Sequence, residues 1–223
     1  MRRGRTRAPA PAAATVAAFL AMLAGPAPAD AWEASAGWSL ADVGLHDDRG
    51  GLVLGVGSRA ALGSAAVDLV YALEYVQKRG AQPTWFADPV GGFRLEDAEV
   101  TLHVAQPVVM LELAALPRSL PRPRAGLSAG LKLSEAWSSF PGAPSEAWGY
   151  KDLDFTAHFG LAWRSGPFGL EARYCRGLTG QLVPDPTGAE PAAAKAEDPL
   201  PGVATPREGA RVSNWQFAAV FAF

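Results

Sequence analysis

The sequence predicts an all-β fold, an eight-stranded antiparallel up-and-down β-barrel that spans a membrane and follows a cleaved signal peptide. Three observations carry this prediction. Apolar and polar residues alternate along eight segments, the N-terminus has the pattern of a secretory signal, and the C-terminal strand ends on an aromatic residue. Alternation with period two places successive side chains on opposite faces of a strand.

Residues 1–29 have the three parts of a signal peptide. Four arginines among the first seven residues precede an uncharged apolar run, Ala12–Ala24, and Ala27–Ala29 supplies the small residues of a cleavage site, with Ala29–Ala31 as the alternative. The run is shorter than the ~20 residues of a membrane-spanning helix. We expect cleavage after residue 29 and a single barrel domain over residues 30–223.

Removal of the signal peptide leaves an acidic domain. The whole chain has 20 Lys and Arg against 22 Asp and Glu, and the signal peptide takes away four arginines and no acid, which leaves 16 basic and 22 acidic residues. Without a basic cluster, such a domain is a poor nucleic-acid binder, so no nucleic-acid partner is expected. Cys175 is the only cysteine, which excludes an internal disulfide.

Eight segments show the alternation of half-buried strands, with aromatic and aliphatic residues on one face and charged residues, small polar residues or Gly on the other. Eight strands of about ten residues match a small transmembrane barrel. In chain order, the segments are 32–40, 52–59, 67–75, 99–113, 124–133, 152–164, 168–175 and 215–223.

The fourth segment contains Pro107, which removes a ladder hydrogen bond and is usually confined to edges or bulges. Because a closed barrel has no edge, we expect a β-bulge at Pro107 that exchanges the two faces of the strand. The residues expected outside are Val100, Leu102 and Val104 before the bulge and Val109, Leu111 and Leu113 after it, which leaves Met110 and Glu112 inside.

The connections alternate between long and short, as in transmembrane barrels with long extracellular loops and short periplasmic turns. An even number of strands then places both termini in the periplasm. The Pro- and Ala-rich connection 180–211 cannot bury a core, and we expect a long mobile extracellular loop there. The long connections are 43–50, 80–92, 138–149 and 180–211, and the short ones are 63–64, 117–123 and 165–167.

The last nine residues, Trp215–Phe223, place four aromatic residues and one alanine on one face. A lipid-facing apolar band with aromatics at its borders is typical of bacterial outer-membrane barrels. The strands alone leave two soluble alternatives, a sandwich with a buried terminal strand and a barrel with its apolar face inward. The signal peptide and the terminal Phe223 favour the membrane barrel.

Four stretches of the chain carry a family resemblance. They are the proline-containing strand 100–109, the segment 124–130, the segment 169–179 and the last strand, 214–223. Over residues 32–223 the chain resembles the outer-membrane protein β-barrel domain family, also called PorT-like, and the OmpA-like eight-stranded barrels. The resemblance implies a Gram-negative outer-membrane location, contact with outer-membrane lipid, and recognition by the barrel assembly machinery of the C-terminal strand ending in Phe223. It implies no reaction.

No catalytic, cofactor-binding or metal site is predicted. His46 lies beside two acids in a long connection, where we expect it to be solvated, and His103 and His158 are expected among the polar residues of the interior. Outer-membrane deacylases place a serine two residues after a histidine, but Ala105 and Gly160 occupy those positions here. The sequence has no metal-ligand cluster and no phosphate loop, so we expect no enzyme and no cofactor.

The inward faces are expected to hold paired charges. An eight-stranded barrel has an interior that side chains fill, or that holds one small ligand. We therefore expect a structural or surface-interaction barrel with a closed, charge-filled lumen; the alternative is a porin-like barrel that transports or binds small solutes or hydrophobic ligands. The expected inward acids are Glu33, Asp68, Glu74, Glu99, Asp152, Asp154 and Glu171, and the bases are Arg59, Arg124, Lys132, Arg164 and Arg173.

Overall fold

The structure is a computed structural model, and it describes residues 32–43, 47–62, 66–87, 93–117, 119–137, 148–180, 182–184 and 211–223. The expected signal peptide, His46 and most of the expected loop 180–211 lie outside these residues. Within the described residues, no helix has the length and apolar character needed to cross a membrane.

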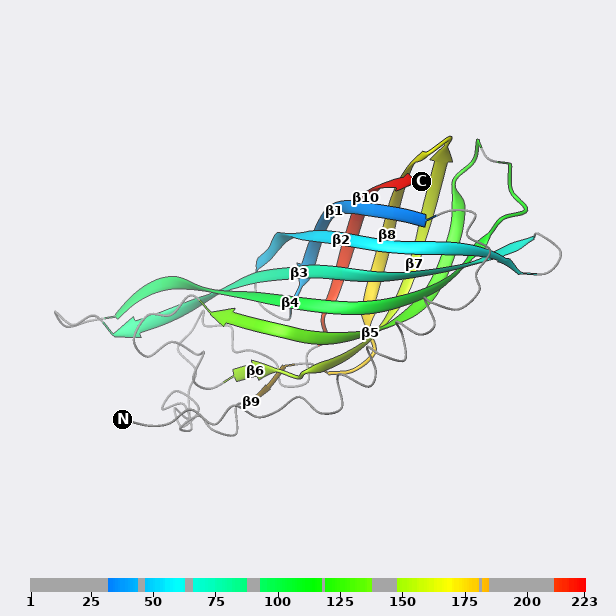
Figure 1. The fold of residues 1–223 in the computed structure, drawn as a ribbon. Helices are drawn as coiled ribbons and strands as arrows, with labels where there is room; N and C mark the ends of the chain where they lie inside the picture. Colours follow the sequence, from blue (N-terminus) through cyan, green and yellow to red (C-terminus); the bar gives the residue numbers. More distant parts are fainter. Residues whose placement is uncertain are drawn as a thin grey trace.

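The described residues form an all-β fold, as predicted, with eight antiparallel strands closed into a barrel (Figure 1). A separate two-stranded sheet, β6–β9, was not predicted; β9 lies in the expected loop 180–211, and β6 begins in the expected loop 138–149 and ends one residue beyond it. The barrel order is β1-β10-β8-β7-β5-β4-β3-β2. The strands are β1 (Trp32–Asp42), β2 (Asp47–Leu62), β3 (Val67–Ala87), β4 (Phe93–Leu113), β5 (Arg122–Trp137), β6 (Trp148–Tyr150), β7 (Leu153–Ser165), β8 (Phe168–Gly177), β9 (Leu182–Pro184) and β10 (Ser213–Ala222).

The strand register fixes the width of the barrel. A path through directly paired residues starts at Trp32, passes through all eight strands and returns to β1 at Asp42, ten residues further along the same strand. A stagger of this kind tilts the strands by roughly 35–45° from the barrel axis, and eight strands leave an interior that side chains fill. The path is Trp32, Ser58, Tyr71, Val109, Leu127, Ala157, Arg176, Ser213, Asp42.

The barrel is longer on one side than on the other. Strands β3 and β4 have 21 residues each, whereas β8 and β10 have 10. The prediction of a loop over residues 80–92 is wrong for most of that range, because β3 and β4 remain paired as far as Ala87 and Phe93. This ribbon extends beyond the shorter strands (Figure 1).

Apolar side chains cover the outside of the barrel, whereas the inside holds the charged and polar side chains together with a smaller set of apolar ones. In β1, β2, β3, β5, β7, β8 and β10 the predicted apolar face is the outer one. On β7, Phe155 is 50% exposed while its neighbour Thr156 is buried, and on β10 Phe217 and Gln216 show the same contrast. The alternation therefore predicted the facing of these strands correctly.

Strand β4 is the exception, because the expected bulge at Pro107 does not occur. The pairing of β4 with β3 runs through Pro107 without a register shift. The shift lies in the pairing of β4 with β5, where Leu133 and Ser134 are both exposed and the facing of β5 changes. After Pro107 the predicted facing is confirmed, with Val109, Leu111 and Leu113 outside and Met110 and Glu112 inside. Before Pro107 it is wrong, because the side chains of Val100, Leu102 and Val104 are buried inside the barrel.

Candidate functional site in the barrel lumen

The lumen near the short turns is organised around Glu112, whose side chain is fully buried. Its carboxylate accepts hydrogen bonds from Arg59 Nη1 at 2.5 Å and Arg124 Nε at 2.6 Å, and Arg122 Nη1 lies at 3.4 Å. Glu112 is also the direct cross-strand partner of Asp68. Like charges in such a pair repel each other, and Arg59 offsets this because it donates to Asp68 as well, at 3.2 Å.

Further ion pairs join this network to the other side of the barrel. Arg124 Nη1 donates to Glu171 Oε2 at 2.8 Å, and Arg164 Nη2 donates to Glu33 Oε2 at 2.7 Å. A buried charge without a partner costs several kcal/mol, so the pairing is a condition for keeping these groups inside. Seven acids and seven bases of the described lumen lie in ion pairs: Glu33, Asp68, Glu74, Glu112, Glu135, Asp154 and Glu171 with Arg59, Lys78, Arg122, Arg124, Lys132, Arg164 and Arg173.

Arg173 forms the next layer of the lumen. Its guanidinium donates to the Glu74 carboxylate and, at 2.7 Å, to Gln216 Oε1, while Gln106 Nε2 donates to the same Glu74 oxygen at 3.0 Å. The residue opposite Arg173 on β7 is Gly160. A Cβ there would lie 2.6 Å from the Arg173 Cβ, so the glycine leaves space for the arginine stem.

Above this layer lies a group of three residues that the sequence did not bring together. His158 is fully buried, its Nε2 lies 2.7 Å from Ser128 Oγ, and its Nδ1 lies 3.2 Å from the Cys175 sulfur. The inward position of His158 was predicted, but its contact with Ser128 of β5 was not. A serine beside a histidine is a nucleophile arrangement. Here all three side chains are buried in the lumen, so the geometry fits a packed polar layer.

Three residues expected in the interior lie elsewhere. His103 points outward from β4, and its Nδ1 meets the hydroxyl of Tyr75 on the outer wall at 2.5 Å. Glu99 lies on the same face of β4, and its half-exposed side chain pairs with Arg49 at 2.6 Å. Asp152 precedes β7 and its side chain is 83% exposed. The first two errors share one cause, the misassigned facing of β4.

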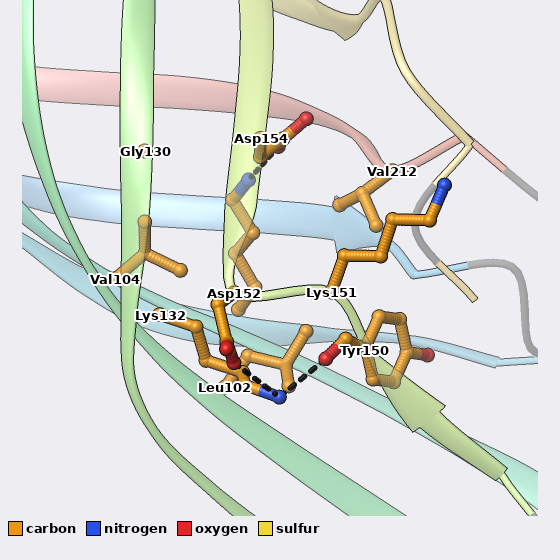
Figure 2. A pocket seen from close by; sticks show the side chains of 10 residues that line it. Leu102, Val104, Gly130, Lys132, Tyr150, Lys151, Asp152, Asp154 and Val212 are labelled. Atoms are coloured by element: carbon orange, nitrogen blue, oxygen red, sulfur yellow. Dashed lines mark hydrogen bonds and ion pairs between the residues drawn. The ribbon is translucent and has the colours of Figure 1, made fainter. Parts of the chain in front are cut away.

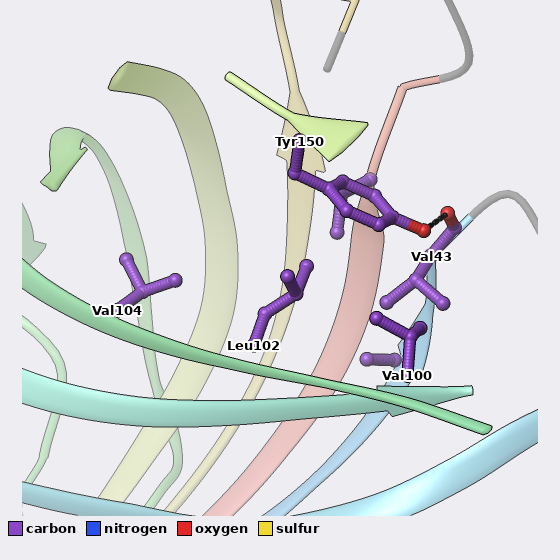
Figure 3. Packing of buried hydrophobic residues seen from close by; sticks show 7 residues of the cluster. Val43, Val100, Leu102, Val104 and Tyr150 are labelled. Carbon is purple, nitrogen blue, oxygen red and sulfur yellow. Dashed lines mark hydrogen bonds between the residues drawn. The ribbon is translucent and has the colours of Figure 1, made fainter. Parts of the chain in front are cut away.

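The lumen towards the long connections is lined by a cluster of buried, mostly apolar side chains. The Tyr150 ring packs in this cluster, and its hydroxyl donates to the Val43 carbonyl at 2.7 Å (Figure 3). Burial raises the pKa of the Tyr150 phenol above its usual value, and the Glu135 and Asp42 carboxylates add to the effect, so the hydroxyl stays a donor. We call these residues the mouth cluster: Ala41, Val43, Val100, Leu102, Val104, Tyr150 and Val212.

A small cavity of about 20 Å³ lies between the mouth cluster and the polar lumen (Figure 2). Its walls include Leu102 and Val212, and Lys78 Nζ lies 3.3 Å from Asp154 Oδ2 at its border. Lys132 also lines it and contacts Glu135 at 2.9 Å and the Tyr150 carbonyl. A cavity of this size holds about one water molecule. Lys78 was missed from the sequence because the alternation predicted that its strand ends at residue 75.

Within the described residues, no group of three or more His, Cys, Asp or Glu side chains is placed to hold a metal ion. The lumen thus combines a paired charge network, a neutral polar layer and an apolar mouth. The chain matches no protein-family model and no curated protein.

Proposed function

We propose that this protein is a non-enzymatic barrel of the bacterial outer membrane, with a structural or surface-interaction role and a closed, charge-filled lumen. The observation that carries the proposal is the distribution of polarity across the barrel wall. Leu127, Phe159 and Leu170 are 56–60% exposed on the outside, whereas Glu112 and His158 are fully buried inside. Soluble monomers rarely expose an apolar patch above a few hundred Å², and lipid is the surrounding that favours such a wall.

The aromatic residues of the outer wall support the same proposal. Phe168, Phe221 and Phe223 cluster at the short-turn end, with ring centroids 5.3 and 6.3 Å apart. Trp215 and Tyr174 are in contact further along the wall, at 5.2 Å. Eight residues of tilted strand separate Phe223 from Trp215, which is roughly 20 Å along the barrel axis. Aromatic girdles border an apolar band of about 25 Å in outer-membrane barrels.

The pairing of the barrel ends supports a periplasmic location of both termini. The backbone amide of Trp32 donates to the Phe223 carbonyl at 3.2 Å, and the amide of Phe223 donates to the Trp32 carbonyl at 2.9 Å. Both residues lie at the end of the barrel that carries the short turns. In this proposal residues 1–29 direct export, and residues 180–211 lie outside the cell.

The paired charges of the lumen favour a closed barrel over the transport alternative. Side chains from all sides of the barrel meet in the Glu112 network and the Arg173 layer, as expected of an eight-stranded interior. In planar bilayers, the purified protein is expected to give no sustained conductance steps. Sustained steps would favour the transport alternative.

The assembly step tests the membrane location in cells. Deletion of Phe223 removes the terminal aromatic and the backbone pairing with Trp32, and we expect a clear fall in the amount of barrel recovered in the outer-membrane fraction. Phe168→Ala is the matched control, because it removes another aromatic of the same end, 63% exposed, without touching the C-terminus. Equal outer-membrane levels of the deletion variant and the parent would contradict the proposal.

A further inference from the structure

The sheet β6–β9 is attached to the barrel in a different way from every barrel strand. It forms a sheet of its own, in which Trp148–Tyr150 pairs with Leu182–Pro184. Figure 1 shows it beside the barrel and not as part of the wall. Within the described residues, its contacts with the barrel run through Tyr150 and Asp152, at the end of β6 and just after it.

Among the described residues, four hydrogen bonds join this segment to the barrel. The Tyr150 hydroxyl donates to the Val43 carbonyl at 2.7 Å, and the Tyr150 amide donates to Glu135 Oε2 at 3.1 Å. Lys132 Nζ donates to the Tyr150 carbonyl, and the Lys132 amide donates to the Asp152 carbonyl at 2.8 Å. Three of the four involve Tyr150, so this residue connects the small sheet to both β5 and the end of β1.

The Tyr150 ring fills an apolar seat inside the barrel. Val43, Val100, Leu102 and Val212 are each at most 3% exposed and share the mouth cluster with the ring (Figure 3). The seat offers an apolar enclosure for one ring and a carbonyl acceptor, Val43 O, at its edge. Beneath it lies the 20 Å³ cavity bordered by Lys78 and Lys132 (Figure 2).

We propose that the sheet β6–β9 is a lid over the lumen, that Tyr150 is its latch, and that the seat of the Tyr150 ring is a binding site for a small phenol-like molecule when the lid lifts. The ligand class follows from the seat, since a ring and a hydroxyl donor are the groups that the seat accommodates. The site goes beyond the proposed function. It is a dead end, because the Arg173–Glu74 pair and the Glu112 network close the lumen below it.

The single thiol of the chain reports on this lid. Cys175 is 1% exposed and faces the lumen, where its cross-strand partner Asn214 pairs with Ala41 of the mouth cluster. A reagent that enters through an open lid therefore reaches Cys175 after passing the mouth cluster. From the short-turn end, the same reagent would have to cross the Glu112 network and the Arg173 layer.

The test measures the rate at which a small charged methanethiosulfonate reagent modifies Cys175 in the full chain, reconstituted in lipid vesicles, with mass spectrometry as the readout. The wild-type protein is expected to react slowly but faster than the barrel unfolds, and Tyr150→Ala at least ten-fold faster than the wild type. Tyr150→Phe keeps the ring without the hydroxyl and should fall between them. Leu133→Ala changes an exposed outer-wall residue of β5 and should react as the wild type does.

The binding site is tested in the Tyr150→Ala protein with p-cresol, which is the tyrosine side chain as a free molecule. We expect p-cresol to slow the modification of Cys175 towards the wild-type rate, and toluene, which lacks the hydroxyl, to slow it less. Circular dichroism confirms that each variant is folded. A folded Tyr150→Ala protein that reacts no faster than the wild type would overturn the lid, and a rate unchanged by p-cresol would overturn the binding site.

Discussion

The two halves of the lumen reach the same filled state by different means. Near the short turns, Glu112 and Arg124 are buried as ions, and together with the partly buried Arg59 they stabilise one another through contacts of 2.5–2.6 Å. Near the long connections, Val100, Leu102 and Tyr150 fill the lumen without charge. The charged half is built from strand residues alone, whereas the apolar half also needs residues outside the barrel strands, which are Val43, Tyr150 and Val212.

This difference has consequences for stability. A buried ion pair contributes little beyond an apolar pair of the same size, but the loss of one partner leaves a buried charge unpaired. The charged half is therefore sensitive to single substitutions that remove a charge. The apolar half responds in proportion to the volume removed, because its energy comes from burial and close packing.

The largest effect is expected at the centre of the charge network. Glu112→Gln keeps the shape of the side chain but removes the fully buried carboxylate that Arg59 and Arg124 share. Arg59 then keeps Asp68 and Arg124 keeps Glu171, so the buried network carries uncompensated positive charge, and we expect a loss of about 3–5 kcal/mol in the free energy of unfolding. Urea unfolding in lipid vesicles, followed by tryptophan fluorescence, measures it. Glu99→Gln, in a half-exposed pair with Arg49, is the control and should cost less than about 1 kcal/mol. Equal losses in the free energy of unfolding for Glu112→Gln and Glu99→Gln would contradict the special sensitivity of the charged half of the lumen.

A smaller effect is expected in the apolar half. Leu102→Ala removes a buried side chain of the mouth cluster, 3% exposed, and should cost about 2–4 kcal/mol in the same unfolding experiment. The lid segment around Tyr150 can move into part of the space, which places the expected loss below that of Glu112→Gln. Leu133→Ala, 56% exposed on the outer wall, should cost clearly less. A larger loss of stability for Leu133→Ala than for Leu102→Ala would contradict this, because it would mean that the outer wall contributes more packing energy than the mouth cluster.

The smallest of the three effects is expected at the border between the halves. Within the described part of the chain, Lys78 pairs with one carboxylate, that of Asp154 at 3.3 Å, and Thr156 and Thr179 contact the same carboxylate at 3.3 Å. Lys78→Met leaves the two hydroxyls on Asp154, so the expected loss is about 1–3 kcal/mol, again from urea unfolding. Adding Asp154→Leu should recover part of it, because the unpaired charge is then removed. A double variant less stable than Lys78→Met would show that Asp154 has a second essential partner.

The sequence predicted the strand order and most of the facing because period-two alternation is unambiguous in β7 and β10. It failed in β4, where residues 100–109 carry apolar side chains at both odd and even positions. The bulge was then assigned to Pro107, whereas Leu133 and Ser134 on the neighbouring strand take up the shift. The facing of β4 depends on its partner strand, which a pattern along one strand does not contain.

The candidate site was predictable only in part. The alternation predicted that most of these charged residues face the lumen. It did not predict which acid pairs with which base, because a contact across the lumen joins strands that are far apart in the chain. Arg173 and Glu74, for example, are separated by 99 positions. The mouth cluster was not predicted, since Val100, Leu102 and Val104 were assigned to the outer wall and Tyr150 lies between the expected loop 138–149 and the expected strand 152–164.

The most direct test of the central claim, an apolar wall in lipid around a polar lumen, is a nitroxide scan along β7. Single cysteines at positions 154–161 are introduced into a Cys175→Ala chain in lipid vesicles, and spin-label relaxation by oxygen and by a water-soluble nickel complex is measured. The labels at positions 155, 159 and 161 are expected to respond strongly to oxygen and weakly to nickel, and those at 154, 156 and 158 weakly to both. A strong nickel response at 155, 159 and 161 would contradict the account, because it would place the outer wall in water.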